Sequence, residues 1–222
     1  MPLRIYWKGD LAVHGSLKAS EKQKMIRGNP PMIRSFIAID FPQATREKLV
    51  AIQEQLKQSR AGVRWVKPAG IHLTLKFLGN IHPVQVDDIA AAVAQLVRDE
   101  PPITLCAAGL GAFPSHRKPR VIWVGLQGEV DRLVNIQAGV EKALEPLGFA
   151  REGRGFRPHL TIGRVKDRLR LQSLIEAMST AELPEFNSFD ANEIILYKSD
   201  LRPTGAIYTK LHRMPLAAPA PT

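Results

Sequence analysis

Apolar and polar residues follow two periods along this chain. Short apolar runs rich in β-branched residues predict strands, and stretches with apolar residues three or four positions apart predict helices. The predicted strands cover residues 35–39, 71–78, 102–109, 121–126, 158–164, about 191–198 and about 206–211. One predicted helix begins after Pro42, with Leu49, Ile52 and Leu56 on one face, and others cover about 83–98, 129–146 and 168–179.

Both ends of the chain lack these periods. Residues 1–31 mix Lys and Arg with Gly and Pro, so we expect an N-terminal extension outside the core fold. A basic RNA-binding arm is the alternative interpretation of this segment. The Pro- and Ala-rich residues 213–222 predict a flexible C-terminal tail, which leaves a single domain over residues 32–212.

The order of predicted elements in the first half recurs in the second half. His-Leu-Thr occurs twice, at His72 and at His159, and the two copies are 87 residues apart (positions 72 and 159). The same offset carries Phe36, in the first predicted strand, onto Trp123, in the first predicted strand of the second half. The sequence therefore predicts a duplicated β-α-β-α-β unit, with two lobes related by a pseudo-two-fold axis around a cleft.

The spacing within each motif places its two polar side chains together. On a strand, residues i and i+2 point to one face, so His72 lies beside Thr74 and His159 lies beside Thr161. A neutral imidazole can take a proton from attacking water, and an imidazolium can give one to a leaving oxygen. Threonine hydroxyls can donate to phosphate oxygens. A single motif would be typical of an ordinary strand histidine, whereas the pair favours metal-free phosphodiester chemistry.

Three residues near the motifs have two interpretations each. Arg157 shares a face with the second histidine only if the strand has begun there, which Pro158 makes doubtful. Strict alternation turns Arg164 away from that face, unless a bulge or strand end at Gly163 returns it. Each arginine either binds phosphate or is an ordinary surface residue. Phe77, at the position equivalent to Arg164, either stacks on a nucleobase or belongs to the core.

Composition narrows the cellular setting. The net charge of +10 and the pI of about 10.0 favour a polyanionic partner such as nucleic acid, although a basic surface can also serve solubility alone. The single cysteine, Cys106, excludes an intramolecular disulfide, and its apolar surroundings predict a buried, inert thiol that fits a reducing cytoplasm. We expect no membrane span, because no apolar stretch approaches the length of about 18 residues that a span needs. We also expect no zinc site, because the remaining histidines lack ligand spacing to either motif, and no cofactor.

Several segments resemble a known family. The two motifs resemble the signatures of the two-histidine (2H) phosphoesterases, and the match is closer to the RNA 2′,3′-cyclic phosphodiesterases, also called 2′-5′ RNA ligases. The resembling segments are RSFIAIDFP (34–42), RWVKPAGIHLTLKFLG (64–79), FPSHRKPRVIWVGL (113–126), HLTIGR (159–164) and LYKSDLRPTGAIYTKL (196–211). The resemblance implies a bilobal α+β fold with two antiparallel sheets around a central cleft.

The resemblance also implies an activity and a role for each residue. It implies hydrolysis of RNA 2′,3′-cyclic phosphate ends to 2′-phosphomonoesters, with weak reverse 2′-5′ ligation, by a monomer without cofactor. His72 would then donate a proton to O3′ and His159 would accept one from water. Thr74, Thr161 and Arg164 would hold the phosphate, and Phe77 would meet the base. The near-symmetric repeats alone do not assign the acid and the base.

Two other functions fit the same residues. The first is another 2H activity, such as cleavage of a 2′-5′ linkage or of a small cyclic nucleotide. The second is an RNA-end binding module whose histidines are vestigial, against which the two intact motifs argue.

Overall fold

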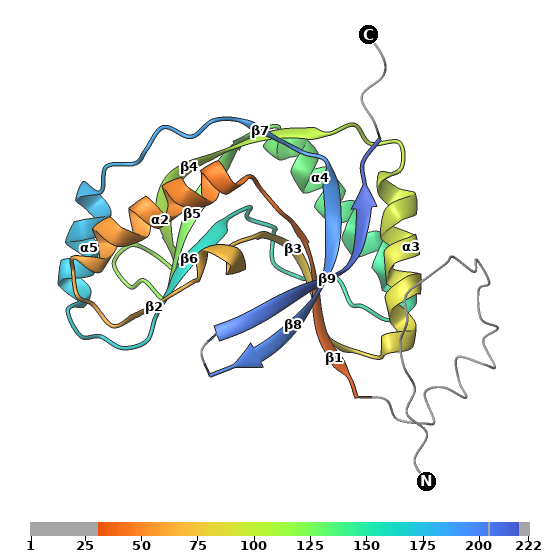
Figure 1. Ribbon diagram of the computed structural model, residues 1–222, viewed down its shortest axis with the longest axis horizontal. Coiled ribbons are helices and arrows are strands. Elements are labelled where there is room, and N and C mark those ends of the chain that lie inside the picture. Colours follow the sequence, from red (N-terminus) through yellow and green to blue (C-terminus); the bar gives the residue numbers. More distant parts are fainter. Residues whose placement is uncertain (1–30, 204, 218–222) are drawn as a thin grey trace.

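The computed structural model describes residues 31–203 and 205–217. The predicted N-terminal extension lies outside the described residues except for Pro31, and so do residues 218–222 of the predicted tail. Within the described part, the helices and strands follow one another in the predicted order (Figure 1).

The described residues form antiparallel strands, four α-helices and three short 3-10 turns. The strands are β1 (Ile33–Ile39), β2 (Val63–Trp65), β3 (Leu73–Ile81), β4 (Ile103–Phe113), β5 (Val121–Gly128), β6 (Leu160–Val165), β7 (Phe189–Ala191), β8 (Glu193–Arg202) and β9 (Gly205–Pro215). The helices are α2 (Gln43–Lys57), α3 (Val86–Val97), α4 (Val130–Leu144) and α5 (Leu171–Thr180), and the 3-10 turns are η1 (Pro68–Gly70), η2 (Pro83–Gln85) and η3 (Glu145–Leu147). The sequence did not predict β2, β7 or η1, because three residues are too few to show a period.

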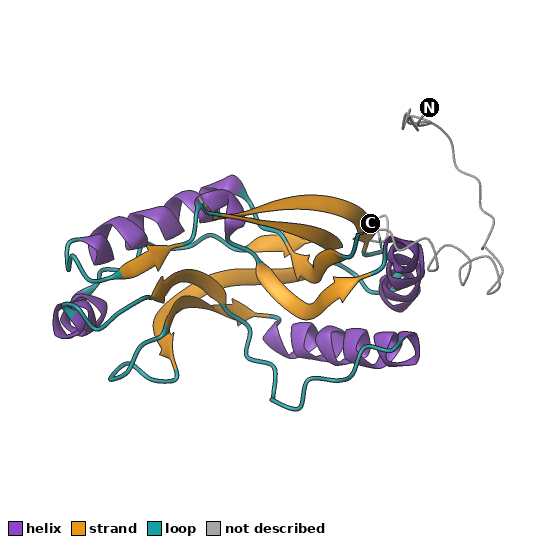
Figure 2. Ribbon diagram, turned by 90° about the horizontal axis from the view of Figure 1, so that it is seen from below, coloured by secondary structure: helices purple, strands orange, loops and turns teal. Residues whose placement is uncertain are grey.

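The two predicted sheets join into one curled antiparallel sheet (Figure 2). The strand order is β7-β4-β5-β6-β3-β1-β8-β9, and β2 also pairs with β6. β3 and β6 meet through a single residue pair, Leu73 with Leu160. The two halves of the sheet therefore touch where the two His-Leu-Thr motifs begin.

Each repeat gives its third strand to the other half of the sheet. The first repeat places β1 and β3 in one half and β4 in the other, and the second places β5 and β6 in one half and β8 in the other. Each lobe therefore combines strands of both repeats. The reason is local: the loop of residues 114–120 joins β4 directly to β5, and strands joined by a short loop pair readily as a hairpin.

The helices lie around the outside of the curled sheet (Figures 1 and 2). The predicted apolar face of α2 is confirmed, since Leu49, Ile52 and Leu56 are fully buried. α2, from the first repeat, packs behind β6, whereas α4, from the second repeat, packs behind β3. Each motif strand is thus backed by a helix of the other repeat.

The C-terminal end of the fold lies further along the chain than the sequence predicts. β9 continues to Pro215, and Met214 and Leu216 are buried in the core. The backbone N–H of Ala217 donates to the carbonyl of Glu100 at 2.8 Å. Residues 213–217 therefore belong to the domain and not to a tail, because two apolar side chains in this Pro- and Ala-rich stretch reach the core.

Two compositional expectations can be compared with the structure. Cys106 is buried, as predicted, and its Sγ lies 3.2 Å from the carbonyl oxygen of Phe186. Among the residues that the structure describes, no helix has both the length and the apolar character needed to cross a bilayer.

The C-terminal strand generates a stability prediction. Met214→Ala removes a buried side chain and leaves a cavity, so we expect the free energy of unfolding to fall by about 2–5 kcal/mol in urea denaturation. Thr209→Ala, at an exposed site of the same strand, is the control and should change it much less. Equal effects of the two substitutions would contradict the placement of Met214 in the core.

Candidate active site

The two histidines lie on either side of the residue pair that joins the halves of the sheet. Each immediately precedes a motif strand, and the residues that follow them, Leu73 and Leu160, form the single pair that joins β3 to β6. These leucines are buried on the side of the core, so the flanking histidines and threonines lie on the other side. We call the side that carries His72, Thr74, His159 and Thr161 the histidine face.

A bulge in β3 brings Phe77 to the histidine face. Ala38 of β1 pairs with Thr74, and Phe36 pairs with Phe77, so two steps along β1 match three steps along β3. The extra residue shifts the alternation. Thr74 and Phe77 therefore share a face, which strict alternation from the sequence does not predict.

β6 contains the equivalent bulge. Trp123 of β5 pairs with Thr161, and Val121 pairs with Arg164, so Arg164 lies on the histidine face beside Thr161. The extra residues, Leu75 in β3 and Ile162 in β6, are also 87 positions apart. The glycine next to the β6 bulge is not its cause, since the equivalent position in β3 is Lys76.

Phe77 is not a core residue. Its side chain is 65% exposed, and its ring centroid lies 6.1 Å from that of Phe36. The core interpretation of Phe77 is therefore wrong. An exposed aromatic ring on the histidine face offers a flat surface on which a base can stack.

Aromatic rings hold His72 on two sides. Phe36 stacks on the imidazole with ring centroids 4.5 Å apart, and Tyr208 of β9 meets it edge-on at 5.0 Å. Tyr197 of β8 stacks on Phe36 at 5.1 Å, and its ring centroid lies 6.3 Å from that of His72. These contacts restrict the rotation of the imidazole and bury much of it.

Aromatic rings surround His159 in a similar way. Phe113 meets its imidazole edge-on at 5.0 Å, and Trp123 lies 6.3 Å away. Trp123 can lie across β4 only because position 111 is glycine, where an added Cβ would be 2.2 Å from the indole ring. Trp123 is the repeat equivalent of Phe36, so both repeats use an aromatic residue of their first strand beside their histidine.

Backbone carbonyls orient both imidazoles. Nδ1 of His159 lies 2.7 Å from the carbonyl oxygen of Arg157, and a backbone hydrogen bond with Gly70 favours the protonated form of His72. Both partners precede their histidine by two residues. When Nδ1 of His159 donates to this carbonyl, Nε2 is the nitrogen left for chemistry.

The side chain of Arg157 is not aligned by the strand. β6 begins at Leu160, so Arg157 lies in the preceding loop and the alternation rule does not reach it. Arg157 is exposed, and its observed contact with His159 is made by its backbone carbonyl.

Burial lowers the pKa of both histidines. The pKa of His72 is lowered to about 4: desolvation is the largest cause and the charges of Arg46 and Arg164 add to it, while the backbone of Gly70 and the charge of Asp40 oppose them. Desolvation also lowers the pKa of His159, and the charge of Arg164 adds to this. The free site therefore favours two neutral imidazoles at neutral pH.

An acidic residue stands near only one of the two histidines. Asp40 accepts hydrogen bonds from Lys210 at 2.9 Å and from Tyr197 at 3.3 Å, and it forms an ion pair with Arg46. Burial would raise the pKa of Asp40, but Lys210 and Arg46 outweigh it and lower the pKa. Within the described chain, the groups that shift the pKa of His159 include no carboxylate.

Arg46 also secures the turn before His72. Its guanidinium donates to the carbonyls of Pro68 at 2.8 Å and Ile71 at 2.9 Å, on both sides of Gly70. The turn η1, and with it the carbonyl that contacts His72, is thereby tied to α2.

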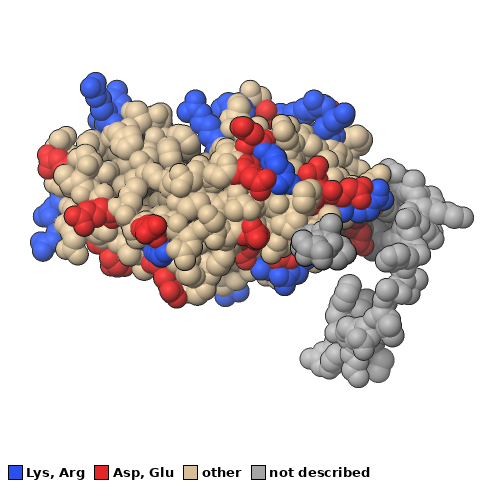
Figure 3. Space-filling model, turned by 90° about the horizontal axis from the view of Figure 1, so that it is seen from above, with Lys and Arg blue, Asp and Glu red and all other residues tan. Residues whose placement is uncertain are grey.

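Arginines gather on the histidine face. Arg64 of β2 pairs with Arg164, and directly opposite residues of an antiparallel pair point to the same side. Arg34 lies on the side of Phe36, and the charges of Arg164 and Arg34 partly offset the raised pKa that burial gives Tyr208. By contrast, acidic and basic side chains are interspersed on the face seen in Figure 3. The arrangement suits an anionic ligand at the histidines.

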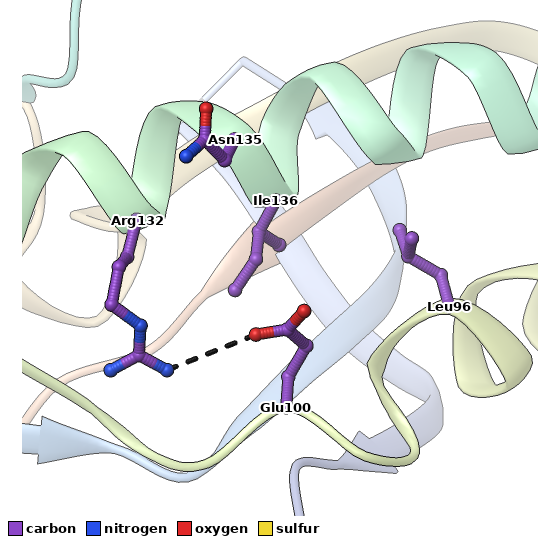
Figure 4. Close-up of a pocket in the computed structure, with 5 residues that line it drawn as sticks. All are labelled: Leu96, Glu100, Arg132, Asn135 and Ile136. Atoms are coloured by element: carbon purple, nitrogen blue, oxygen red, sulfur yellow. Dashed lines mark ion pairs between the residues drawn. The ribbon is translucent and has the colours of Figure 1, made fainter.

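A pocket elsewhere contains none of the candidate residues. It lies between α3 and α4, where Arg132 and Glu100 form an ion pair at 3.8 Å (Figure 4). Over residues 31–203 and 205–217, no three His, Cys, Asp or Glu side chains are grouped as metal ligands would be.

The family follows from comparison with known proteins. The model of the LigT-like phosphoesterase family matches residues 39–123 and again residues 124–208, one match for each repeat. The chain belongs to the LigT-like phosphoesterase family. The double match agrees with the duplication that the sequence predicts.

Curated relatives and solved structures support the family. The RNA 2′,3′-cyclic phosphodiesterase of Methanothermobacter thermautotrophicus is 32% identical over 179 residues, which cover 81% of this chain and 96% of that protein. The protein of the same name from Methanocaldococcus jannaschii is 36% identical, with 79% and 96% covered. The crystal structure of E. coli LigT complexed with 3′-AMP has a TM-score of 0.65 and 26% identity, with 84% of this chain and 99% of that chain covered.

Sequence reasoning missed several residues of the site. The repeat offset relates Phe36 to Trp123, but the sequence does not place either ring beside a histidine. It does not identify Asp40 or Arg46 as site residues, because their roles depend on contacts between distant elements. Tyr208 reaches His72 only through the β8–β9 hairpin.

Burial of His72 predicts a pH-dependent stability. The folded state binds this proton less well than the unfolded state, whose histidine pKa is about 6.5, so the stabilisation is present above pH 6.5 and is lost as the pH falls. Between pH 7 and pH 5 the loss from His72 is about 2 kcal/mol. In urea denaturation, the difference in the free energy of unfolding between the two pH values should be smaller for His72→Gln than for the wild type.

The control for this prediction is His116→Gln, in the exposed β4–β5 loop, which should keep the wild-type difference. Millimolar inorganic phosphate should reduce the loss at pH 5, because an anion at the site favours the imidazolium. An unchanged pH dependence in His72→Gln would contradict the argument.

Proposed function

We propose that this chain hydrolyses RNA 2′,3′-cyclic phosphate ends to 2′-phosphomonoesters by metal-independent catalysis with two histidines. The observation that carries the proposal is the juxtaposition of His72 and His159 at the Leu73–Leu160 pair, with Arg164 close enough to influence both. The names of the relatives and the E. coli LigT complex with 3′-AMP support a nucleotide substrate.

The proposed reaction uses one proton transfer at each histidine. Nε2 of His159 takes a proton from water as the water oxygen attacks phosphorus. The bond between phosphorus and O3′ breaks, and the imidazolium of His72 gives its proton to O3′. The product carries a 2′-phosphate and a free 3′-hydroxyl, and exchange with solvent restores both histidines. Each transfer contributes roughly 10²–10⁴ in rate.

The surroundings favour His72 as the acid. The carboxylate of Asp40 stabilises an imidazolium at His72, whereas the side-chain charge that shifts the pKa of His159 is the positive charge of Arg164. Burial leaves His72 neutral in the free site, so the anionic cyclic phosphate has to restore its proton on binding. Substrate binding then prepares the acid and the reaction together.

Other residues of the histidine face have separate tasks in this proposal. Thr74, Thr161 and Arg164 donate to the non-bridging oxygens, where negative charge grows in the transition state. Phe77 stacks on the terminal base. With a 5′-hydroxyl in place of water as the nucleophile, the same groups support weak 2′-5′ ligation: the hydroxyl gives its proton to His159 and attacks phosphorus, the bond to O3′ breaks, and O3′ takes the proton of His72. Both histidines come from one chain, so a monomer suffices, and the single Cys106 is compatible with action in a reducing cytoplasm.

The first test removes each histidine. His72→Ala and His159→Ala should each lower turnover of an oligonucleotide with a 2′,3′-cyclic end by at least 100-fold, with the near-ultraviolet circular dichroism unchanged. The wild type should keep its activity in excess chelator. His212→Ala is a matched control outside the histidine face, and its activity should equal that of the wild type.

Product mapping decides between this activity and its alternatives. A terminal 2′-phosphate supports the proposal, whereas cleavage of an internal 2′-5′ linkage without hydrolysis of the cyclic end would replace it. Full activity in either alanine variant would refute catalysis by two histidines. Tight, salt-sensitive RNA binding without turnover would favour a binding module.

A second test assigns the acid. In a cyclic phosphate whose O3′ is replaced by sulfur, the leaving thiolate needs no proton, because thiols have a pKa of about 8.5. We expect His72→Ala to recover most of the wild-type rate on this analogue, while His159→Ala stays inactive. Recovery by His159→Ala alone would exchange the two roles.

A further inference from the structure

We propose that two buried glutamines, Gln53 and Gln137, are positioning residues that hold the bulges of β6 and β3 and so set Arg164 and Phe77 on the histidine face. The inference rests on the proposed function, since it assigns these glutamines to the same site. It extends that function by naming residues that touch no substrate.

Gln53 of α2 holds the bulge of β6. Its side-chain amide donates to the carbonyl of Ile162 at 2.8 Å and to the carbonyl of Val66 at 2.8 Å. The backbone N–H of Val66 donates to the same Ile162 oxygen at 2.9 Å. The amide therefore clamps the extra residue of the bulge to the segment that follows β2. Arg164 follows Ile162 by two residues.

Gln137 of α4 holds the bulge of β3. Its side-chain amide donates to the carbonyl of Leu75 at 3.2 Å and to Oε1 of Glu141 at 3.0 Å. Glu141 in turn forms a buried ion pair with Lys76, the residue after the bulge. Phe77 follows Leu75 by two residues, so the network fixes the chain directly before it.

The two contacts are equivalent under the repeat. Leu75 and Ile162 are 87 positions apart, and Gln53 and Gln137 are 84 positions apart in the first helix of each repeat (positions 53 and 137). In both cases a helix of one repeat holds the strand of the other. In each repeat the first helix thus places a glutamine amide on the carbonyl of the extra residue of a bulge.

The energetics argue that these glutamines are present for their hydrogen bonds. Their exposed fractions are 2% and 8%, and an amide buried without partners costs about 1–3 kcal/mol. An apolar residue would fill the same space without that risk. A bulge, however, leaves a backbone group outside the regular ladder, and a glutamine side chain can reach it. The bulges in turn decide which side chains face the substrate.

The predicted consequences differ between the two glutamines. Arg164 meets the phosphate, so loss of Gln53 should slow the hydrolysis of any cyclic phosphate. Phe77 meets the base, so loss of Gln137 should slow a nucleoside 2′,3′-cyclic phosphate but not ribose 2′,3′-cyclic phosphate, which has no base. If the glutamines had a merely structural role, each substitution would lower kcat/KM equally for both substrates.

The experiment measures kcat/KM for both substrates in a set of variants. Gln53→Met and Gln137→Met keep the length of the side chain and remove the donor. Each is also combined with Arg164→Ala and with Phe77→Ala. Gln55→Met, on the exposed side of α2, and Asn135→Met, on the exposed side of α4, are the matched controls. Gln53→Asn and Gln137→Asn replace the methionine variants if those do not fold.

The expected result is a specific pattern of coupling. Gln53→Met should lower kcat/KM about tenfold on both substrates, because small misplacements of a catalytic group cost 10- to 100-fold. Combined with Arg164→Ala it should cause almost no further loss, whereas combined with Phe77→Ala the two effects should multiply. Gln137→Met should lower kcat/KM for the nucleotide substrate only. In a protein that already carries Phe77→Ala, it should cause no further loss.

Three results would overturn the inference. These are multiplication of the Gln53→Met and Arg164→Ala effects, equal losses on both substrates in Gln137→Met, or losses matched by the control variants. Failure of the proposed function is distinguishable, because the wild type would then turn over neither substrate. In that case calorimetric binding of 3′-AMP replaces kcat/KM: Gln53→Met and Arg164→Ala should weaken it by a similar factor, and unchanged binding in Gln53→Met would overturn the inference.

Discussion

The single backbone pair between Leu73 and Leu160 is the constraint on which the rest of the site depends. It is the only pairing between β3 and β6 in the described chain, and it lies directly after both histidines. Any sliding of one half of the sheet along the other would separate the imidazoles. Two exchanges resist such sliding: β4 and β8 each pair in the half that holds the other repeat's motif strand, and α2 and α4 each pack behind the other repeat's motif strand. Each repeat is therefore anchored in both halves. A duplicated unit with self-contained lobes would have had only this one pair to hold them together.

The bulges show where reasoning from the sequence succeeds and where it stops. Period and repeat predicted the strands, the histidine–threonine pairs and the equivalence of Phe77 with Arg164. The alternation rule then turned both of these residues away from the histidines, since it assumes a regular ladder. Gly163 correctly raised the possibility of a bulge in β6, but β3 has the same bulge without a glycine. The signal lies instead in Gln53 and Gln137, whose partners are known only once the helices are placed.

Other differences have the same physical origin. The strand exchange could not be predicted, because periodicity tells which face of a strand is buried and not which strand lies beside it. Met214 and Leu216 were assigned to a tail because prolines and alanines surround them, yet the core accepts both. Tyr208 and Phe113 meet the histidines edge-on from strands of opposite halves, and no spacing in the sequence connects either residue to its histidine. Contacts between distant elements thus account for what the sequence left open.

A duplicated site begins symmetric, but the proposed reaction needs one acid and one base. Burial lowers the pKa of both histidines, and that of His72 more strongly, so burial alone does not make His72 the acid. The difference comes from residues that the repeat does not preserve: Arg164 in place of Phe77, and Asp40 with Lys210 beside His72 alone. Asp40 favours an imidazolium without being strong enough to keep His72 charged in the free site. In the proposed reaction a bound phosphate anion adds the missing charge, so that the site becomes asymmetric in protonation only when substrate is present. On this argument the apolar packing around the histidines serves catalysis directly, because it makes the proton on His72 depend on the substrate.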